Sequence, residues 1–205
     1  MDLYFILPLV ALAAYQFLRV RDQRRRIVLL GAHLNQFRIE PLMEAVMQGY
    51  ERALGESSNE RREQVWRYLE PQEQELSREF ARFAEAFSKV WNGQTQTSTL
   101  PFAFPYADRV LPRKAFDLRD LMLVHAHGIA TVASNTAGRS LRDKAFTLSA
   151  ELLLMQHSCH WFCRSRNVAS ARMTVRHQVT QTQLLESATP ETREAYERIT
   201  GVRVL

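Results

Sequence analysis

An uncharged apolar run at the N-terminus limits the folds open to this chain more than any other feature. Residues 3–18, LYFILPLVALAAYQFL, carry no charge and only one strongly polar side chain, Gln16. As a helix rising about 1.5 Å per residue they extend about 24 Å, which is short for a hydrocarbon core of about 30 Å but workable with local thinning of the bilayer. Tyr4 and Tyr15 are placed to mark the two interfaces. We therefore expect residues 1–18 to form a transmembrane anchor.

Five arginines follow this run directly: Arg19, Arg21, Arg24, Arg25 and Arg26. Positive charge collects on the cytoplasmic side of membrane helices, so we expect a single-pass protein of the bacterial inner membrane, with its N-terminus outside and the rest in the cytoplasm. A cleavable signal peptide would carry its positive charge ahead of the apolar run, although an Ala11-Leu12-Ala13 cleavage site is formally present. A buried N-terminal core helix is the other open alternative, because the run is shorter than most membrane spans.

The rest of the chain has the periodicity of helices. Ile27, Leu30, Leu34 and Phe37 predict a basic juxtamembrane stalk helix over residues 19–40 that ends or kinks at Pro41. Only seven glycines in 205 residues, no sustained period-two alternation and no solenoid repeat favour an all-α fold. Residues 41–205 are therefore predicted to form a cytoplasmic helical domain, a bundle of about five helices.

Capping residues and prolines predict the helix boundaries within that domain. Ser57 with Glu60 resembles a capping box, and Pro71 is expected to split the helix that follows. The polar and proline-rich segment 92–116 is expected to be a loop without helix. The remaining helix starts are predicted at Asp117, at Ser140 with its partner Asp143, at Asn167 and at Thr189.

The helix predicted from Leu141 to about Arg166 has two apolar faces. One face holds Leu141, Ala145, Leu148, Leu152, Met155, Cys159, Phe162 and Cys163, and the other holds Phe146, Ala150, Leu153, Leu154, His157 and Trp161. A helix that is apolar on two sides lies between neighbours on both sides. We therefore expect this helix to be the central element of the bundle.

The end of the central helix carries the candidate metal ligands. Cys159, His160 and Cys163 recur at three- and four-residue spacing, and His125 on the preceding helix could complete a site for zinc or copper. His157 lies too far around the helix to join them. The alternative is that both cysteines only pack in the core, where free cysteine is common. A pairing of His125 with either thiol would also suggest nucleophilic chemistry, but no orienting acid is identifiable.

Aromatic side chains gather where the chain cannot form a long helix. Phe102, Phe104 and Tyr106 alternate in LPFAFPYADRVLP, so their rings are expected to point to one side. The favoured expectation is that these rings cover the open end of the bundle. The alternative is an exposed strip that binds a partner or dips into lipid headgroups, close to the cations Arg109, Arg113 and Lys114.

The functional prediction combines these features. The charge changes sign along the chain and the densest basic run adjoins an apolar segment, so a nucleic-acid partner is not expected. The common phosphate-binding, hydrolase and metalloprotease motifs do not occur, which argues against an enzyme. The leading hypothesis is a membrane-anchored, non-enzymatic scaffold or adaptor for a protein partner, without a cofactor. The second is a metal-binding or redox-sensing module using Cys159, His160 and Cys163.

Overall fold

The computed structural model describes residues 3–203, with side chains from residue 6 onward, so the first two residues of the predicted anchor and the Tyr4 side chain lie outside it. Helices dominate the fold, as predicted. The elements are, in chain order, α1 Leu3–Leu34, α2 Ile39–Gly55, α3 Asn59–Ser88, α4 Asn92–Thr95, β1 Gln96–Ser98, α5 Ala107–Val110, the 3-10 turn η1 Pro112–Lys114, β2 Ala115–Asp117, α6 Leu118–Ser134, α7 Leu141–Cys163, α8 Arg166–His177, α9 Gln181–Ser187 and α10 Pro190–Thr200.

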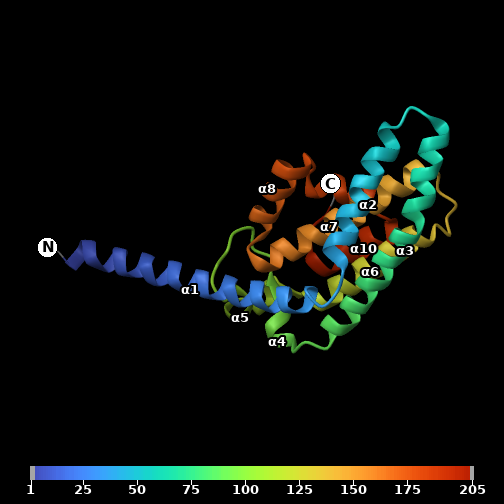
Figure 1. Cartoon of the computed structure of the whole chain (residues 1–205). Coiled ribbons are helices and arrows are strands. Elements are labelled where there is room, and N and C mark those ends of the chain that lie inside the picture. The colour runs from blue at the N-terminus through green and yellow to red at the C-terminus, as the bar shows by residue number, and fades with distance from the viewer. Residues whose placement is uncertain (1–2, 204–205) are drawn as a thin grey trace.

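Helix α1 runs unbroken for 32 residues, and its N-terminal part projects from the body (Figure 1). No helix boundary separates the predicted anchor from the predicted stalk. The C-terminal part of α1 packs against α7 and α3, and Leu30 belongs to the core. Over the residues with described side chains, no helix is both long and apolar enough to cross a membrane, so the predicted transmembrane span lacks structural support.

The predicted stalk differs from the observed helices. Helix α1 ends at Leu34, and α2 begins at Ile39, two residues before Pro41. Proline is accepted there because the first turn of a helix has no partner for its backbone N–H groups, so the missing N–H costs nothing. Residues 19–40 are therefore the end of α1, a short turn and the start of α2, all of them attached to the body.

Helix α3 passes through Pro71 without a break, which contradicts the predicted split. Pro71 itself is exposed, whereas Leu69 and Glu73 on either side of it are buried. Packing of α3 against α2 and α6 holds the helix together across the missing backbone hydrogen bond. The predicted capping box at Ser57 is also wrong, because Ser58 occupies the N-cap position and makes no side-chain cap.

Helix α7 runs through the middle of the body (Figure 1). Its Leu148, Leu152 and Met155 join a core with α1, α2, α3 and α6. Its Ala150, Leu153, Leu154 and Trp161 join a second core with residues of α8, α9 and α10. The prediction of a central helix buried on two faces is therefore confirmed, although Leu141 and Phe146, in the first two turns, are exposed.

The segment predicted as a loop at 92–116 contains short regular elements. Strands β1 and β2 pair antiparallel, with Thr97 opposite Phe116, and a one-turn helix, α5, forms between them. Strands of three residues are too short to show an alternating pattern, which is why the sequence did not indicate them. Residues 99–114 thus connect the two strands of a hairpin, and we call them the hairpin connection.

Three of the predicted helix starts are confirmed by their caps. The side chains of Asp117, Ser140 and Thr189 each accept a hydrogen bond from a backbone N–H of the following turn. At the fourth start, Ser165 caps α8 in place of Asn167. Helix α8 ends at His177, where Gln178 adopts a left-handed backbone conformation, and α9 begins after Thr180.

Candidate functional site

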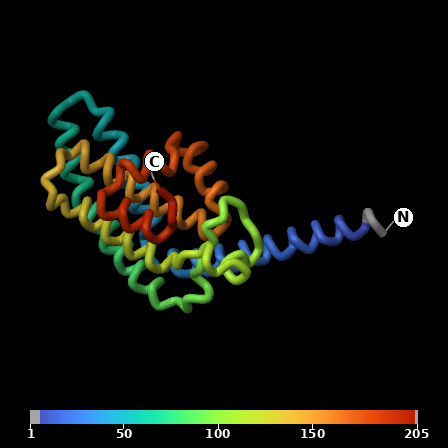
Figure 2. The backbone as a smooth tube through the Cα atoms, turned by 180° about the vertical axis from the view of Figure 1, so that it is seen from behind, coloured from blue at the N-terminus to red at the C-terminus, as the bar shows by residue number. Residues whose placement is uncertain are grey.

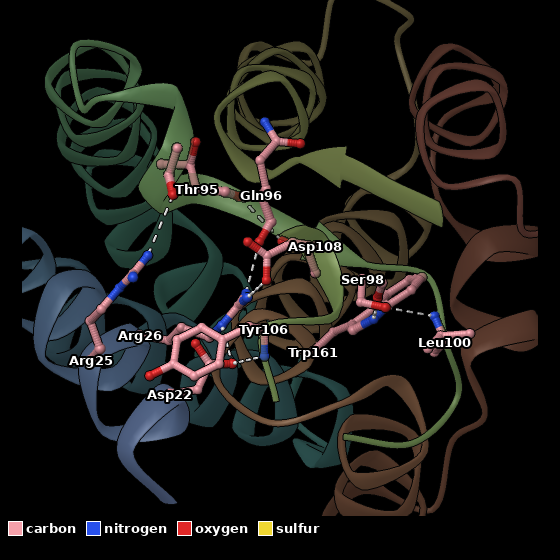
Figure 3. Close-up of polar contacts among 12 residues, drawn as sticks. Asp22, Arg25, Arg26, Thr95, Gln96, Ser98, Leu100, Tyr106, Asp108 and Trp161 are labelled. Atoms are coloured by element: carbon pink, nitrogen blue, oxygen red, sulfur yellow. Dashed lines mark hydrogen bonds and ion pairs between the residues drawn. The ribbon is translucent and has the colours of Figure 1, made fainter. Parts of the chain in front are cut away.

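The hairpin connection is attached to α1 by a buried cluster of charges (Figure 3). One guanidinium nitrogen of Arg26 lies 2.6 Å from Asp108 Oδ1, and its Nε lies 3.3 Å from Asp22 Oδ2. A third nitrogen donates to the backbone oxygen of Gln96 at 2.8 Å, and the guanidinium stacks over the Phe162 ring. All three charged side chains are buried. Arg26 therefore joins α1, the hairpin and α7.

Further contacts fix the hairpin connection along α1. The Tyr15 hydroxyl donates to the backbone oxygen of Ala103 at 2.8 Å, and the Tyr15 and Phe104 rings lie 6.4 Å apart. About two turns further along α1, the Tyr106 backbone N–H donates to Asp22 Oδ2. The connection therefore follows α1 for about two turns, at the level where the helix leaves the body (Figures 1 and 2).

The five arginines predicted to contact a membrane have different environments. Arg21 and Arg24 are exposed, Arg19 and Arg25 are half-buried, and Arg26 is buried. Arg26 is thus a structural residue, and its assignment to a membrane surface is corrected. The reason is helical geometry, because one face of this part of α1 packs on the body and the arginines are distributed around the helix. Asp22 and Asp108, the partners of Arg26, were not identified from the sequence.

The aromatic residues of the hairpin connection do not cover the bundle. Phe102 is 60% exposed and Phe104 is 44% exposed, while the half-buried Tyr106 ring lies under the guanidinium of Arg109. Val110, Leu111, Arg109, Arg113 and Lys114 in the same connection are exposed as well. The expectation of a cover over the core is therefore wrong for Phe102 and Phe104.

The predicted ligands at the end of α7 line an apolar groove. This groove has a volume of about 330 Å³ and lies between α1, α2, α7 and α8. Its residues are mainly apolar, with two arginines, a histidine, a glutamate and a glutamine among them: Ile27, Leu30, Gly31, Leu34, Ile39, Glu40, Met43, Met155, Gln156, Cys159, His160, Cys163, Arg164 and Arg172. A pocket of this size and composition suits an apolar ligand or side chain.

The structure does not assemble a metal site from these residues. Among the described residues, no group of three or more His, Cys, Asp or Glu side chains is placed to hold an ion. Burial raises the pKa of the Cys159 thiol well above its ordinary value and that of Cys163 to about 11. Burial, together with Arg172 and Arg176, lowers the pKa of His160 to about 4. Both thiols therefore stay protonated at neutral pH, whereas metals and oxidants react with thiolates.

His125 lies apart from the two cysteines. Its Nε2 is 2.9 Å from the Ser158 hydroxyl, and its ring lies beside Tyr196. Both His125 and Ser158 are fully buried, and the Ser158 hydroxyl donates to the Leu154 backbone oxygen. Burial lowers the pKa of His125 to about 3. The pair is therefore part of the core, where no substrate reaches it, and His125 does not join Cys159, His160 and Cys163.

No protein-family model, curated protein or solved structure matches this chain.

Proposed function

We propose that the apolar end of α1 inserts into a membrane and holds the helical body at its cytoplasmic surface, where the groove between α1, α2, α7 and α8 binds a protein partner. In this proposal the protein is a membrane-anchored adaptor without catalytic activity.

The projecting part of α1 carries the proposal. Its apolar side chains are exposed on every side of the helix: Ile6, Leu7, Leu9, Val10, Leu12, Phe17 and Leu18. Successive residues are about 100° apart, so this helix has no polar face to turn to water. Burying apolar surface gains about 25 cal/mol per Å², which favours lipid or another apolar environment around this helix.

The orientation follows from the charges that come next. Arg21 and Arg24 are exposed on α1 just after the apolar run, and the side of the membrane that keeps such charges is the cytoplasmic one. The body continues from the same end of the helix. We therefore propose that the chain crosses the membrane once, with its N-terminus outside.

The groove supports the partner-binding part of the proposal. Met43 and Met155 give it adaptable apolar walls, and flexible methionines are typical of surfaces that bind helices and peptides. Arg164 and Arg172 lie among its lining residues together with one carboxylate, Glu40, so its cations outnumber its anions. A partner segment with an apolar anchor flanked by acidic residues fits this combination.

Membrane insertion is tested with the full chain. The protein should float with phosphatidylcholine vesicles in a density gradient and resist extraction by carbonate at high pH. In bacteria, a reporter active only in the cytoplasm should work when fused after Leu205, and a periplasmic reporter should be silent there. Flotation failure refutes the anchor, and the opposite reporter pattern refutes the orientation.

Gly31→Leu tests the groove. A Cβ added at Gly31 meets nothing within 4 Å, and Gly31 lines the groove, so we expect the leucine to occupy part of the groove. Proteins that cross-link to the wild-type chain in membranes should be lost from this variant. Thr174→Leu, an exposed change on α8 outside the groove, is the matched control. Equal cross-linking by both variants would exclude the groove as the binding site.

A further inference from the structure

We infer that the hairpin connection is a second membrane contact, in which Phe102 and Phe104 enter the interfacial layer of an anionic bilayer beside α1. This inference rests on the proposed insertion of α1. It adds that the body touches the lipid surface through a particular segment and so has a fixed orientation on it.

The position of the rings along α1 is the first argument. Tyr15 lies three residues before Leu18, the last residue of the apolar run, so it is about 4.5 Å from the end of that run. The Phe104 ring is 6.4 Å from the Tyr15 ring, and the Tyr15 hydroxyl is bonded to Ala103. If the apolar run is in lipid, Phe104 lies at the level of the membrane interface, where aromatic side chains are favoured.

The firm attachment of the connection is the second argument. Asp108 accepts a hydrogen bond from Arg26, and the Tyr106 backbone N–H donates one to Asp22. Two points of the connection are therefore attached to α1 on the C-terminal side of Tyr15. Both figures of the whole chain show this segment extending further toward the N-terminal end of α1 than the rest of the body (Figures 1 and 2). Insertion of α1 therefore brings the connection to the lipid surface before any other part of the body.

Its surface chemistry is the third argument. Phe102, Phe104, Val110 and Leu111 are exposed, together with the cations Arg109, Arg113 and Lys114. The single acidic residue of the connection, Asp108, is buried in its ion pair with Arg26. The outer surface is thus apolar and positive, which matches the interface of a membrane that contains anionic lipids.

Tryptophan scanning in vesicles measures this contact in the full chain. Phe102→Trp and Phe104→Trp place an indole on the connection. Phe146→Trp is the control, since Phe146 is also exposed and lies beside Arg142, but it belongs to the start of α7, and the α6–α7 turn is at the opposite end of the body (Figure 1). The three native tryptophans give the same background in each variant. The probe is a phosphatidylcholine vesicle containing phosphatidylglycerol, with a nitroxide attached near the lipid headgroup.

We expect the added emission of Phe102→Trp and Phe104→Trp to shift to the blue in vesicles and to be lost when the nitroxide lipid is present. The added emission of Phe146→Trp should be unaffected by the nitroxide and remain open to quenching by aqueous acrylamide. Omitting phosphatidylglycerol, or changing Arg109, Arg113 and Lys114 together to Gln, should weaken quenching at Phe102→Trp.

Other outcomes overturn the inference in distinguishable ways. If all variants float with the vesicles but the indoles on the connection escape the nitroxide, α1 is inserted and the second contact does not exist. If those indoles are shielded from acrylamide as well as from the nitroxide, a protein surface covers them. If the protein does not float, the proposed insertion and the second contact both fail.

Discussion

Arg26 and Asp108, 82 positions apart in the chain, hold a guanidinium nitrogen and a carboxylate oxygen 2.6 Å apart inside the body. Asp22 supplies a second carboxylate from the preceding turn of α1. All three side chains are buried, and Arg26 is the one cation facing two carboxylates; Asp22 Oδ1 has no hydrogen-bond partner among the described residues. This buried cluster is what makes the C-terminal part of α1 a member of the core.

Removing the cation should therefore destabilise the fold. In Arg26→Ala, two buried carboxylates lose their partner, and breaking a buried pair in this way costs about 3–5 kcal/mol. Arg25→Ala is the matched control, because Arg25 is half-buried and makes one long bond, 3.4 Å, to the Gly93 backbone oxygen; it should cost about 1 kcal/mol or less. Urea denaturation in detergent measures both. Similar losses in the two variants would assign Arg26 a surface role.

Acid should weaken the fold through two buried histidines. Burial lowers the pKa of both His125 and His157 to about 3. His157 lowers the pKa of His125 further, and His160 and Arg166 lower that of His157. The unfolded chain takes up these protons near pH 6.5, so stability is complete above that pH and falls as the pH drops toward 3. At pH 5 each histidine should cost about 2 kcal/mol.

The comparison of variants isolates this effect. The free energy of unfolding, measured between pH 5 and pH 8, should depend less on pH in His125→Gln than in the wild type. His127→Gln, at an exposed position on the same helix, is the matched control. An unchanged slope in His125→Gln would mean that the folded and unfolded chains protonate His125 alike, which would contradict its lowered pKa.

The two cysteines should be unreactive rather than redox-active. Because burial raises the pKa of Cys163 to about 11, its alkylation by iodoacetamide at pH 7 should be at least about tenfold slower than that of a free thiol. The rate should keep rising up to about pH 11, beyond the point at which a free thiol levels off. Cys159 should react only after unfolding. Mass spectrometry of the labelled peptides follows each site, and rapid labelling at pH 7 would contradict the environment described for Cys163.

Replacing both cysteines also separates packing from metal binding. Cys159→Ala with Cys163→Ala should cost about 1–2 kcal/mol from lost burial, and the metal content of the purified protein should not change. Elemental analysis together with thermal unfolding tests this. Loss of zinc or copper with a much larger fall in Tm would restore the metal-binding hypothesis.

Two glycines should respond in opposite ways to alanine. Gly31 faces open space, so Gly31→Ala should stabilise α1 by up to about 1 kcal/mol, the usual gain from replacing glycine inside a helix. A Cβ at Gly49 would overlap a methyl carbon of the buried Leu69. Gly49→Ala should therefore lose about 1–3 kcal/mol from overpacking. Paired thermal denaturation curves give both values, and a gain at Gly49 would mean that α2 and α3 separate easily.

Local signals were sufficient for part of the fold. Asp117, Ser140 and Thr189 start helices because their side chains bond to the next turn, an interaction that depends on neighbouring residues alone. The two apolar faces of α7 were likewise visible, because helical periodicity directly reflects burial on both sides. Pro41 and Pro71 show the limit of this approach. A proline indicates a break, but its position within the first turn of α2 and the packing around α3 decide the outcome.

The contacts of the candidate site were harder to predict from the sequence, because they join residues that are far apart in the chain. The spacing of Asp22 and Arg26 allows an i,i+4 ion pair, but nothing near them indicates Asp108. A run of arginines beside an apolar segment predicts a membrane surface, and only the three-dimensional fold shows which of them face inward. The four-residue spacing of Cys159 and Cys163 predicts that they share one face of a helix. It does not predict the buried surroundings that keep both thiols protonated.

Because α1 is one continuous helix, its projecting N-terminal part and its packed C-terminal part move together. Its 32 residues form a rod of about 48 Å, with an apolar arm outside the body and a second arm held inside it by Arg26. No joint lies between the two arms, so a rotation imposed on the outer arm turns the inner arm, the hairpin connection and the groove through the same angle. A bilayer that is thicker or thinner than the apolar arm would tilt it, and that tilt would appear as a change in the direction in which the groove faces.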